Sequence, residues 1–584
     1  MSASRVTEAL AASELFSSFG PEALAELSEA VEWVSLPGGA VLFHQGEVAD
    51  CMYLVVSGRL RVTREREDGG ARVLGEIGRG ESVGEMALLT GEHRLASVRA
   101  VRDTVLLRLD QAAFERCVER QPTSMLQLTR RLIARYGQAI KSSAGGGGRV
   151  TTVAIVPTSR EVPLSEFTRR LAEAFAAVGP VLRLNSDRVD AALGAGVAQT
   201  PRDHTRSAEL EAWLATEEAR HAAVLYEADL VRSSWTTRCL RQADHILLVG
   251  SDDLSPEPGP IERAMERDGT ESAAGARSLV ILHPERRALY TGTSAWLAER
   301  RVDRHFHVVR DDAADCARLV RMLTGRATAV VLGGGGARCF AQIGVLRALV
   351  EAGIEIDMIG GTSMGAYLAA QYALGWDGER MRRFNTRLWA ELKPLKAYTI
   401  PFVGLTEPSL FIRETRATYG EANVEDLGIP YFCCSSNITR ARLMVHERGP
   451  LWRWLGASIA VPGIGPPLFE KGDLLVDGAV LDNLPIDVMR QRCDGTIIAV
   501  DVSPIEDLRT DPVYTLCPSS AQILGNRLNP FAAPLPVPSL FEILSRCASL
   551  SSVQQVESMK ARARARAARS RRARSRRAAA SRAA

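Results

Sequence analysis

The stretch ATAVVLGGGGAR, from Ala327 to Arg338, joins a run of apolar residues directly to four consecutive glycines. A short apolar run bounded by glycine is typical of a strand buried on both faces of a parallel sheet. Glycines at a strand-to-helix junction leave backbone N–H groups unshielded, so that they and the helix dipole face any anion there. The stretch therefore predicts an α/β domain with an anion cradle at the end of one strand.

A second turn follows the next predicted strand, in the sequence GGTSMG at Gly360 to Gly365. Gly361, Ser363 and Gly365 give the G-x-S-x-G form of a nucleophile elbow, a sharp turn that exposes a serine hydroxyl between a strand and a helix. Both turns fall at the carboxyl edge of the predicted sheet, where such sheets place their sites. We therefore expect Ser363 to lie beside the glycine cradle.

Two kinds of anion compete for the cradle: a nucleotide phosphate, and the oxyanion that forms when a serine attacks an ester carbonyl. The phosphate alternative fits less well, because G-x-x-x-x-G-K-[ST] is absent and G-x-G-x-x-G fails where Cys339 replaces its third glycine. The candidate nucleophile downstream favours the oxyanion.

The histidines of the chain argue against a Ser-Asp-His triad. There are nine, the last is His446, and its strand-like surroundings favour a packing role. A carboxylate bonded directly to the serine can replace the triad, because burial away from water raises its basicity. Asp477, in the sequence DLLVDGA, is the candidate for this base.

Four stretches, VVLGGGGAR, GGTSMGA, ASIAVPGIGPPLF and LLVDGAVLDNLP, resemble the patatin-like phospholipases, and within them the neuropathy target esterase branch. The resemblance implies hydrolysis of phospholipid or lysophospholipid esters through an acyl-serine intermediate, with no metal and no catalytic cofactor. Ser363 would be the nucleophile and Asp477 the base. The oxyanion hole would consist of the N–H groups of Gly334, Gly335 and Gly336.

Two residues depart from the family pattern. Cys339 stands where the family has glycine, so its side chain either disturbs the oxyanion loop or packs as an ordinary thiol. Asp482 stands where asparagine is more usual, and we expect it to be a neighbour of the base.

The domain organisation follows from changes in pattern along the chain. Glycine-punctuated short strands predict a β-roll, and alternating strands and helices predict two α/β domains, the last a patatin-like domain with a mostly parallel sheet. The segment SSAGGGG is typical of a linker. The predicted parts are a β-roll at 1–141, a linker at 142–149, a middle α/β domain at 150–325, the patatin-like domain at 326–558 and a disordered tail at 559–584.

Residues 83–98, VGEMALLTGEHRLASV, resemble the phosphate-binding cassette of cyclic-nucleotide-binding domains. The resemblance implies that Glu85 accepts from a ribose hydroxyl and that Arg94 binds the cyclic phosphate, a bidentate task suited to guanidinium. Gly84 and Ser97 would add contacts, and Leu95 favours cAMP over cGMP as a regulatory ligand. Alternatively, the roll is a docking domain in which Arg94 and Glu85 pair with each other.

Composition limits the remaining possibilities. Scattered cysteines predict reduced thiols, and no apolar run predicts a signal peptide or transmembrane helix, so we expect a cytoplasmic chain, peripheral at a membrane. Eleven Lys and Arg residues at 560–584 turn a net charge of −8 for the rest of the chain into +3. These cations would bind anionic lipid headgroups or belong to a solvated tail. Because no aromatic residues stand among them, they do not indicate sequence-specific nucleic-acid binding. The oligomeric state is left open.

Two uncharged segments each allow two interpretations: residues 454–469 as an acyl pocket or a buried loop, and residues 529–541 as a membrane-contacting flap or a covering loop. The leading functional prediction is a serine esterase of (lyso)phospholipids. Its alternatives are a nucleotide-sensing scaffold with an inactive hydrolase domain, and a nucleotide-binding α/β protein.

Overall fold

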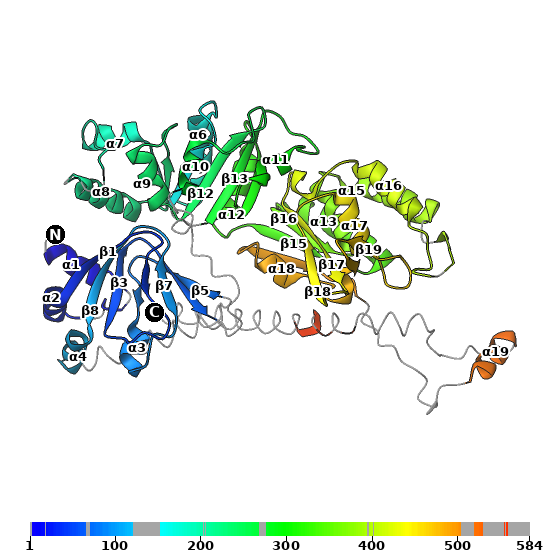
Figure 1. Ribbon diagram of the computed structural model, residues 1–584, viewed down its shortest axis with the longest axis horizontal. Coiled ribbons are helices and arrows are strands. Elements are labelled where there is room, and N and C mark those ends of the chain that lie inside the picture. Colours follow the sequence, from blue (N-terminus) through cyan, green and yellow to red (C-terminus); the bar gives the residue numbers. More distant parts are fainter. Residues whose placement is uncertain are drawn as a thin grey trace. The chain divides into compact units, whose positions relative to one another are not determined.

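The computed structural model describes residues 3–13, 15–17, 19–65, 71–120, 152–201, 204, 206–267, 276–393, 396–400, 402–503, 519–529, 550, 554 and 556–558. The chain divides into two compact units. The first consists of Met1–Arg287, Gly292–Ala327 and Arg490–Thr496, and the second of Ala288–Thr291, Thr328–Met489 and Ile497–Ala584. Figure 1 shows their elements in sequence colours. The predicted linker and tail lie outside the described residues.

The first unit opens with the predicted β-roll, made of two antiparallel sheets with strand orders β1-β8-β3-β6 and β2-β7-β4-β5 (Figure 1). Its strands are β1 (Val31–Leu36), β2 (Val41–Phe43), β3 (Cys51–Ser57), β4 (Leu60–Glu65), β5 (Ala71–Ile77), β6 (Ser82–Val83), β7 (Ser97–Ala100) and β8 (Thr104–Asp110). Its helices are α1 (Ala3–Ala11), α2 (Pro21–Ala30), α3 (Glu85–Thr90) and α4 (Gln111–Arg120). Gly58 shows why glycine separates β3 from β4, since its φ is +99° and a Cβ there would lie 2.5 Å from the Thr104 backbone.

The middle α/β domain has a six-stranded parallel sheet in the order β10-β11-β9-β12-β13-β14. Its strands are β9 (Thr152–Pro157), β10 (Val181–Leu184), β11 (Ala223–Glu227), β12 (His245–Ser251), β13 (Ala276–His283) and β14 (Arg304–Val309). Its helices are α6 (Leu164–Phe175), α7 (Ser186–Leu193), α8 (Ser207–Arg220), α9 (Ser234–Gln242), α10 (Pro260–Arg267), α11 (Thr293–Ala298) and α12 (Ala313–Leu323). Every residue of β9 and β12 is buried, as expected for central parallel strands.

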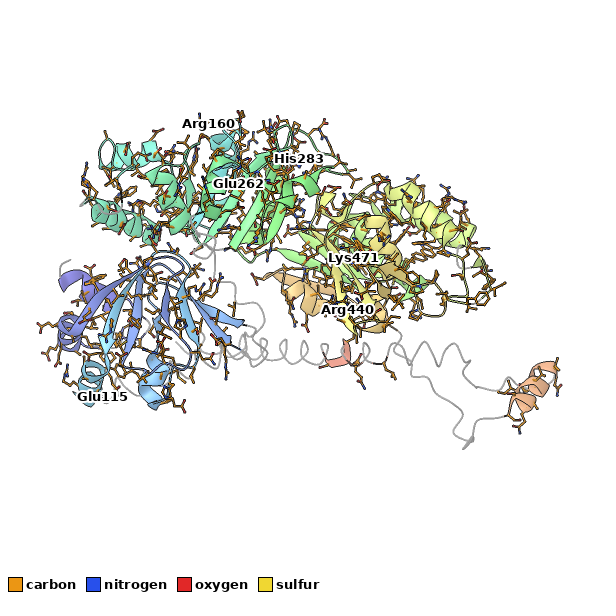
Figure 2. The ribbon with its side chains drawn as sticks, in the orientation of Figure 1. Glu115, Arg160, Glu262, His283, Arg440 and Lys471 are labelled. Atoms are coloured by element: carbon orange, nitrogen blue, oxygen red, sulfur yellow. The ribbon has the colours of Figure 1, made fainter. Side chains whose placement is uncertain are left out.

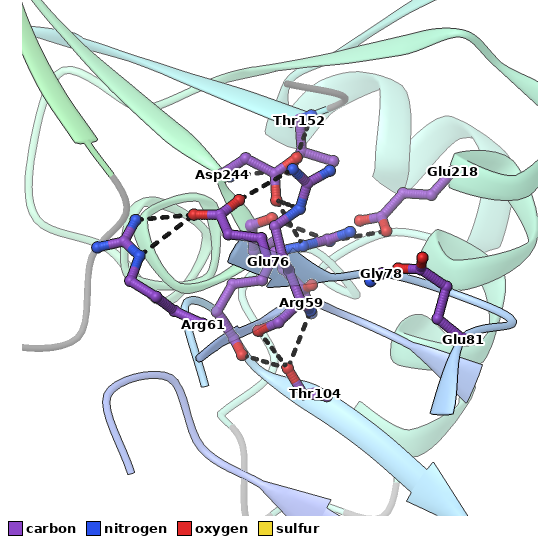
Figure 3. A network of polar contacts seen from close by, with 11 residues as sticks. Arg59, Arg61, Glu76, Gly78, Glu81, Thr104, Thr152, Glu218 and Asp244 are labelled. Carbon is purple, nitrogen blue, oxygen red and sulfur yellow. Dashed lines mark hydrogen bonds and ion pairs between the residues drawn. The ribbon is translucent and has the colours of Figure 1, made fainter. Parts of the chain in front are cut away.

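A buried network of ion pairs within this first unit joins side chains of the β-roll and of the middle domain (Figure 3). Arg59 and Arg102 reach the Oδ1 atom of Asp244 at 3.2 and 3.0 Å, and Arg102 also lies 2.8 Å from Glu218. Arg59 in addition contacts Glu76 at 3.2 Å. Buried charges of this kind are tolerated because each has an opposite charge at hydrogen-bond distance. Charges so far apart in the chain gave no sequence signal.

The second unit is built on a seven-stranded sheet with the order β19-β20-β17-β16-β15-β21, in which β18 pairs with β17. Its strands are β15 (Thr328–Leu332), β16 (Met358–Thr362), β17 (Tyr431–Asn437), β18 (Arg442–His446), β19 (Leu468–Glu470), β20 (Asp473–Asp477) and β21 (Thr496–Val500). The predicted parallel arrangement holds for β15, β16 and β17, whereas β18 and β20 run antiparallel to β17 and β19 antiparallel to β20.

The second unit also contains helices, most of the longer ones labelled in Figure 1. They are η2 (Gly336–Phe340), α13 (Ala341–Glu351), α14 (Met364–Ala373), α15 (Gly378–Asn385), the π-helix η3 (Thr386–Leu392), α16 (Ser409–Tyr419), η5 (Val424–Asp426), α17 (Leu451–Ser458), η6 (Gly478–Val480), α18 (Ile486–Arg490) and α19 (Ser520–Leu528). The core lies between the sheet and α14, whose side chains are almost all buried. α14 therefore anchors the turn that precedes it, which holds Ser363.

Candidate active site

Ser363 occupies a strained turn between β16 and α14. Its φ of 56° and ψ of −135° lie in a region that residues with a side chain rarely adopt. The flanking glycines make the turn possible, because a Cβ on Gly361 would lie 2.3 Å, and one on Gly365 2.4 Å, from the carbonyl oxygen of Leu332. The elbow is thus pressed against the end of β15, where the glycine run begins.

Asp477 ends β20 and lies directly beside this serine. The Ser363 hydroxyl donates a hydrogen bond to Oδ2 of Asp477 at 2.6 Å, and the Ala479 N–H donates to Oδ1 at 2.9 Å. Asp477 is only 3% exposed. Burial raises its pKa to about 6, against the opposing effect of these two hydrogen bonds. The carboxyl is therefore ionised at neutral pH but more basic than an exposed aspartate.

The glycine run lies on the other side of the serine. A Cβ on Gly334 would lie 2.8 Å from that of Ser363, so glycine is needed for this close approach. The Gly334 N–H donates to the Asn483 carbonyl at 3.2 Å, and the Asn483 side chain donates to the Gly334 carbonyl at 3.0 Å. The Gly334 amide is therefore engaged, while within the described ranges no hydrogen-bond partner is recorded for the amides of Gly335 and Gly336.

Ser458, the last residue of α17, holds the elbow from behind. Its hydroxyl accepts the Ser363 N–H at 2.9 Å and donates to the Cys434 carbonyl at 2.7 Å, and it is fully buried. Sequence reasoning missed this residue and Asn483. The available signal for Ser458 was that it is the one hydroxyl among the sixteen residues of WLGASIAVPGIGPPLF.

We predict that Ser458→Ala lowers kcat about tenfold with little change in KM, because the elbow loses the acceptor that fixes the Ser363 backbone. It should also cost about 1–3 kcal/mol of stability, since a buried N–H and a buried carbonyl lose their partner. Kinetics on a soluble ester and chemical denaturation measure the two effects. Ser435→Ala is the matched control, because that buried hydroxyl bonds the His446 ring at 2.7 Å; an equal loss of kcat there would contradict a positioning role for Ser458.

Cys339 and Asp482 take structural positions. The Cys339 thiol is fully buried in the core, 3.4 Å from the Gly333 carbonyl, and burial raises its pKa to about 12. It is therefore a protonated packing thiol. Asp482 accepts the Leu484 N–H at 3.1 Å through its side chain and the Thr362 hydroxyl at 2.9 Å through its carbonyl. Burial raises the Asp482 pKa to about 6 as well.

His446 packs as the sequence suggested. Its ring stacks on Trp454 with centroids 4.2 Å apart, and burial lowers its pKa to about 4, so the imidazole is neutral. The segment after α17 contacts the site through its backbone, since the Asp477 N–H donates to the Ala460 carbonyl at 2.9 Å. Residues 530–541 lie outside the described part of the chain, so the interpretation of that segment stays open.

Two of the predicted nucleotide residues, Gly84 and Arg94, contact each other in the β-roll. Gly84 has a φ of +89° before α3, and its carbonyl accepts from Arg94 at 3.1 Å. Arg94 also donates to the Cys51 carbonyl at 2.7 Å and lies over the Phe43 ring at 4.2 Å. Ser97 accepts the Gln45 N–H at 2.9 Å.

Burial and charge complete this second site. Glu85 is 1% and Arg94 4% exposed, and Arg94 has Asp50 as an ion-pair partner at 3.9 Å.

No metal-binding cluster of three or more His, Cys, Asp or Glu occurs among the residues that the structure describes.

Three family models match successive parts of the chain: a cyclic nucleotide-binding domain at residues 33–121, a Neuropathy Target Esterase family P-loop like domain at 149–328, and patatin-like phospholipase at 330–490. Human patatin-like phospholipase domain-containing protein 6 is 36% identical over 593 residues, with 92% of this chain and 42% of that protein covered. Rat patatin-like phospholipase domain-containing protein 7 is 34% identical over 92% of this chain and 43% of its own length.

The Drosophila melanogaster protein neuropathy target esterase sws is 35% identical, over 91% of this chain and 40% of its own. The chain thus spans less than half the length of these curated relatives. The order of the three domains and these similarities place it in the neuropathy target esterase-like branch of the patatin-like phospholipases.

Proposed function

We propose that the chain is a serine esterase that hydrolyses acyl esters of phospholipids and lysophospholipids. The observation that carries the proposal is the 2.6 Å hydrogen bond from the Ser363 hydroxyl to the buried Asp477 carboxylate, on an elbow that touches the glycine run. The family to which the chain belongs supports a lipid ester as the substrate. The predicted domain boundaries stay predictions, and the oligomeric state stays open.

In the proposed reaction, Asp477 takes the hydroxyl proton as the Ser363 Oγ attacks the ester carbonyl carbon. The N–H groups of Gly335 and Gly336 stabilise the negative charge that develops on the carbonyl oxygen by donating hydrogen bonds to it. Collapse of this intermediate expels the alcohol, which takes the proton from Asp477 and leaves an acyl-serine. Asp477 then takes a proton from water as the water oxygen attacks the acyl carbon. When the bond from that carbon to the Ser363 oxygen breaks, Asp477 returns the proton to this oxygen, which releases the fatty acid and restores Ser363.

A fluorophosphonate and a lipid panel test this proposal together. An activated serine reacts covalently with the fluorophosphonate, and peptide mass spectrometry should place the adduct on Ser363. Incubation with phospholipids and lysophospholipids should release fatty acids, whose analysis gives the preferred headgroup and acyl position. A chain that neither reacts nor hydrolyses any ester would favour the inactive scaffold, and tight ATP or NAD binding lost on changing the glycine run would favour the nucleotide-binding alternative.

As a second function, the β-roll would bind a cyclic nucleotide as a regulatory ligand, with Arg94 as the phosphate ligand. The match to a cyclic nucleotide-binding domain and the hydrogen bond from Arg94 to Gly84, the residue before Glu85, support this. Residue 95 is leucine, which favours cAMP.

We predict that Arg94→Lys weakens cAMP binding about tenfold or more, because an ammonium cannot give the two parallel hydrogen bonds of a guanidinium. Isothermal titration calorimetry measures the change, and lysine keeps the buried positive charge. Arg99→Ala, an exposed position on β7, is the control. Unchanged affinity in Arg94→Lys would exclude Arg94 as the ligand, and no heat with the wild-type chain would reduce the roll to a structural or docking role.

No helix in the described ranges has the length and apolar content needed to cross a bilayer. A peripheral position at a membrane is part of the proposal, because the proposed substrates are lipids, and it calls for a surface that contacts lipid.

A further inference from the structure

A loop in the second unit presents apolar side chains to solvent. Its described residues, 398–400 and 402–405, lie between η3 and α16 in the chain and are called here the apolar loop. The exposed fractions are 88% for Phe402, 75% for Tyr398 and 71% for Ile400, and Val403 and Leu405 are also exposed. Soluble proteins scatter such residues singly, so a group of five within eight positions marks a contact surface.

Hydrogen bonds hold this loop in place. Tyr398 and Thr406 form an antiparallel bridge across its base. The Leu405 N–H donates to the Gly463 carbonyl at 3.1 Å, and the Thr406 N–H and hydroxyl both donate to the Ile464 carbonyl at 2.9 Å. The base of the loop is therefore fastened to the segment after α17, while its apolar side chains stay outside the core.

The same segment reaches the candidate active site. The Ala460 carbonyl accepts a hydrogen bond from the Asp477 N–H at 2.9 Å, and the Val461 carbonyl accepts one from the Ile464 N–H at 3.0 Å. Two residues before Ala460, Ser458 holds the elbow. A short run of backbone thus links the carboxylate and the serine on one side to the apolar loop on the other.

The charges around the loop suit a phospholipid surface. The apolar loop contains no Asp or Glu. The exposed Lys393 and Lys396 precede it, and the acidic residues nearest in sequence are Glu391, before Lys393, and Glu407, after Thr406. Lysines at the base of an apolar tip match phosphate headgroups above an acyl layer, and they attract anionic lipid. A protein partner would instead be expected to present an acidic, apolar groove.

We propose that the apolar loop is the surface by which the second unit docks on a phospholipid bilayer, Phe402 and Ile400 entering the acyl boundary and Lys393 and Lys396 contacting headgroup phosphates. The proposal rests on the proposed function, since it brings the candidate active site to the layer that holds its substrate.

Vesicle binding tests this in the full chain carrying Ser363→Ala, so that no lipid is consumed. Sucrose-loaded vesicles of phosphatidylcholine alone, or mixed with phosphatidylglycerol, are sedimented with the protein. The variants are Phe402→Asp, Ile400→Asp and the control Val350→Asp, an apolar position 54% exposed on α13. Because the cations at 560–584 also attract anionic lipid, binding is measured at low salt and at about 0.5 M NaCl, which screens them. The same variants with Ser363 intact are assayed on a short soluble ester.

We expect Phe402→Asp and Ile400→Asp each to reduce the vesicle partition coefficient about tenfold at both salt concentrations, and Val350→Asp to leave it unchanged. Equal binding of Phe402→Asp and the wild-type chain would overturn the proposal, as would a wild-type chain that binds neither vesicle. Self-association abolished by Phe402→Asp, with vesicle binding unaltered, would assign the loop to a second copy of the chain. Vesicle binding lost in the loop variants of a chain that hydrolyses no ester would uphold the docking surface and overturn the proposed function.

Discussion

Replacing Ser363 by alanine should lower the rate of ester hydrolysis by at least about 10⁴-fold, because the oxygen atom of the proposed acyl intermediate is removed. The residual rate would come from the amides and from substrate binding alone. Hydrolysis of a soluble ester measures this loss, and the fluorophosphonate adduct should disappear with it. The fold should survive, since the side chain changes by one oxygen atom and the backbone contact to Ser458 is kept.

Two controls make this result specific. The circular dichroism of Ser363→Ala should match that of the wild-type chain, and its stability should fall by no more than about 1–3 kcal/mol, the cost of the hydrogen bond that the buried Asp477 carboxylate loses. Ser435→Ala alters a buried serine on β17 that bonds to His446, and it should hydrolyse at a near-normal rate. Turnover by Ser363→Ala at even one tenth of the wild-type rate would remove this hydroxyl from the mechanism.

The second large effect is expected for Asp477→Asn, which keeps the shape of the side chain but removes its basicity. Hydrolysis should fall about 10²–10⁴-fold, the usual contribution of a positioned general base. The fluorophosphonate reaction should slow by a similar factor. A near-normal rate would show that another group takes the Ser363 proton.

The same substitution should raise stability above pH 6. The pKa of Asp477 is raised to about 6 in the folded chain from 3.8, so the protonated form is favoured by folding. The contribution of Asp477 to folding stability is therefore fully present below pH 3.8 and is lost as the pH rises through 6. Above that pH, the buried carboxylate lowers the free energy of unfolding by up to about 3 kcal/mol. Asparagine carries no charge, so denaturation at pH 7.5 should show a gain that vanishes near pH 4.

The pH dependence of the wild-type rate follows from the same group. Because the ionised carboxylate is the proposed base, kcat should fall about tenfold per unit below pH 6 and level off above it. The pKa of Asp482 is raised to about 6 too, so Asp482→Asn is the necessary control. It should leave the profile in place, and a shift of the midpoint in that variant would assign the titration to Asp482.

Much of the fold could be predicted from the sequence. The β-roll, the parallel middle sheet and the β15 and β16 turns were predicted because apolar runs end at glycines that the backbone requires, as at Gly361 and Gly365. The antiparallel side formed by β18, β19 and β20 was not, because pairing direction depends on chain reversals that leave little trace in composition. For the candidate active site, the sequence motifs pointed to Ser363 and Asp477, whose side chains are joined by a hydrogen bond in the structure.

The supporting residues could not be predicted. Ser458 and Asn483 act through single hydrogen bonds to the backbone of distant segments, and a serine or asparagine in a loop has no pattern that specifies such a partner. The sequence also placed Gly334 among the oxyanion donors, whereas its amide is bonded to Asn483. The ion pairs around Asp244 could not be predicted either, because only the tertiary structure brings together charged residues that are far apart in the chain.

The left-handed backbone of Ser363 affects how this protein can evolve. Glycine there would relieve a conformation that costs on the order of 1 kcal/mol or more, just as asparagine at 477 would spare a buried charge. Either substitution gives a more stable protein that no longer hydrolyses esters. A duplicated copy freed from selection for turnover should therefore become inert while still folding well, and an abundant homologue with glycine at this place would be a pseudoenzyme.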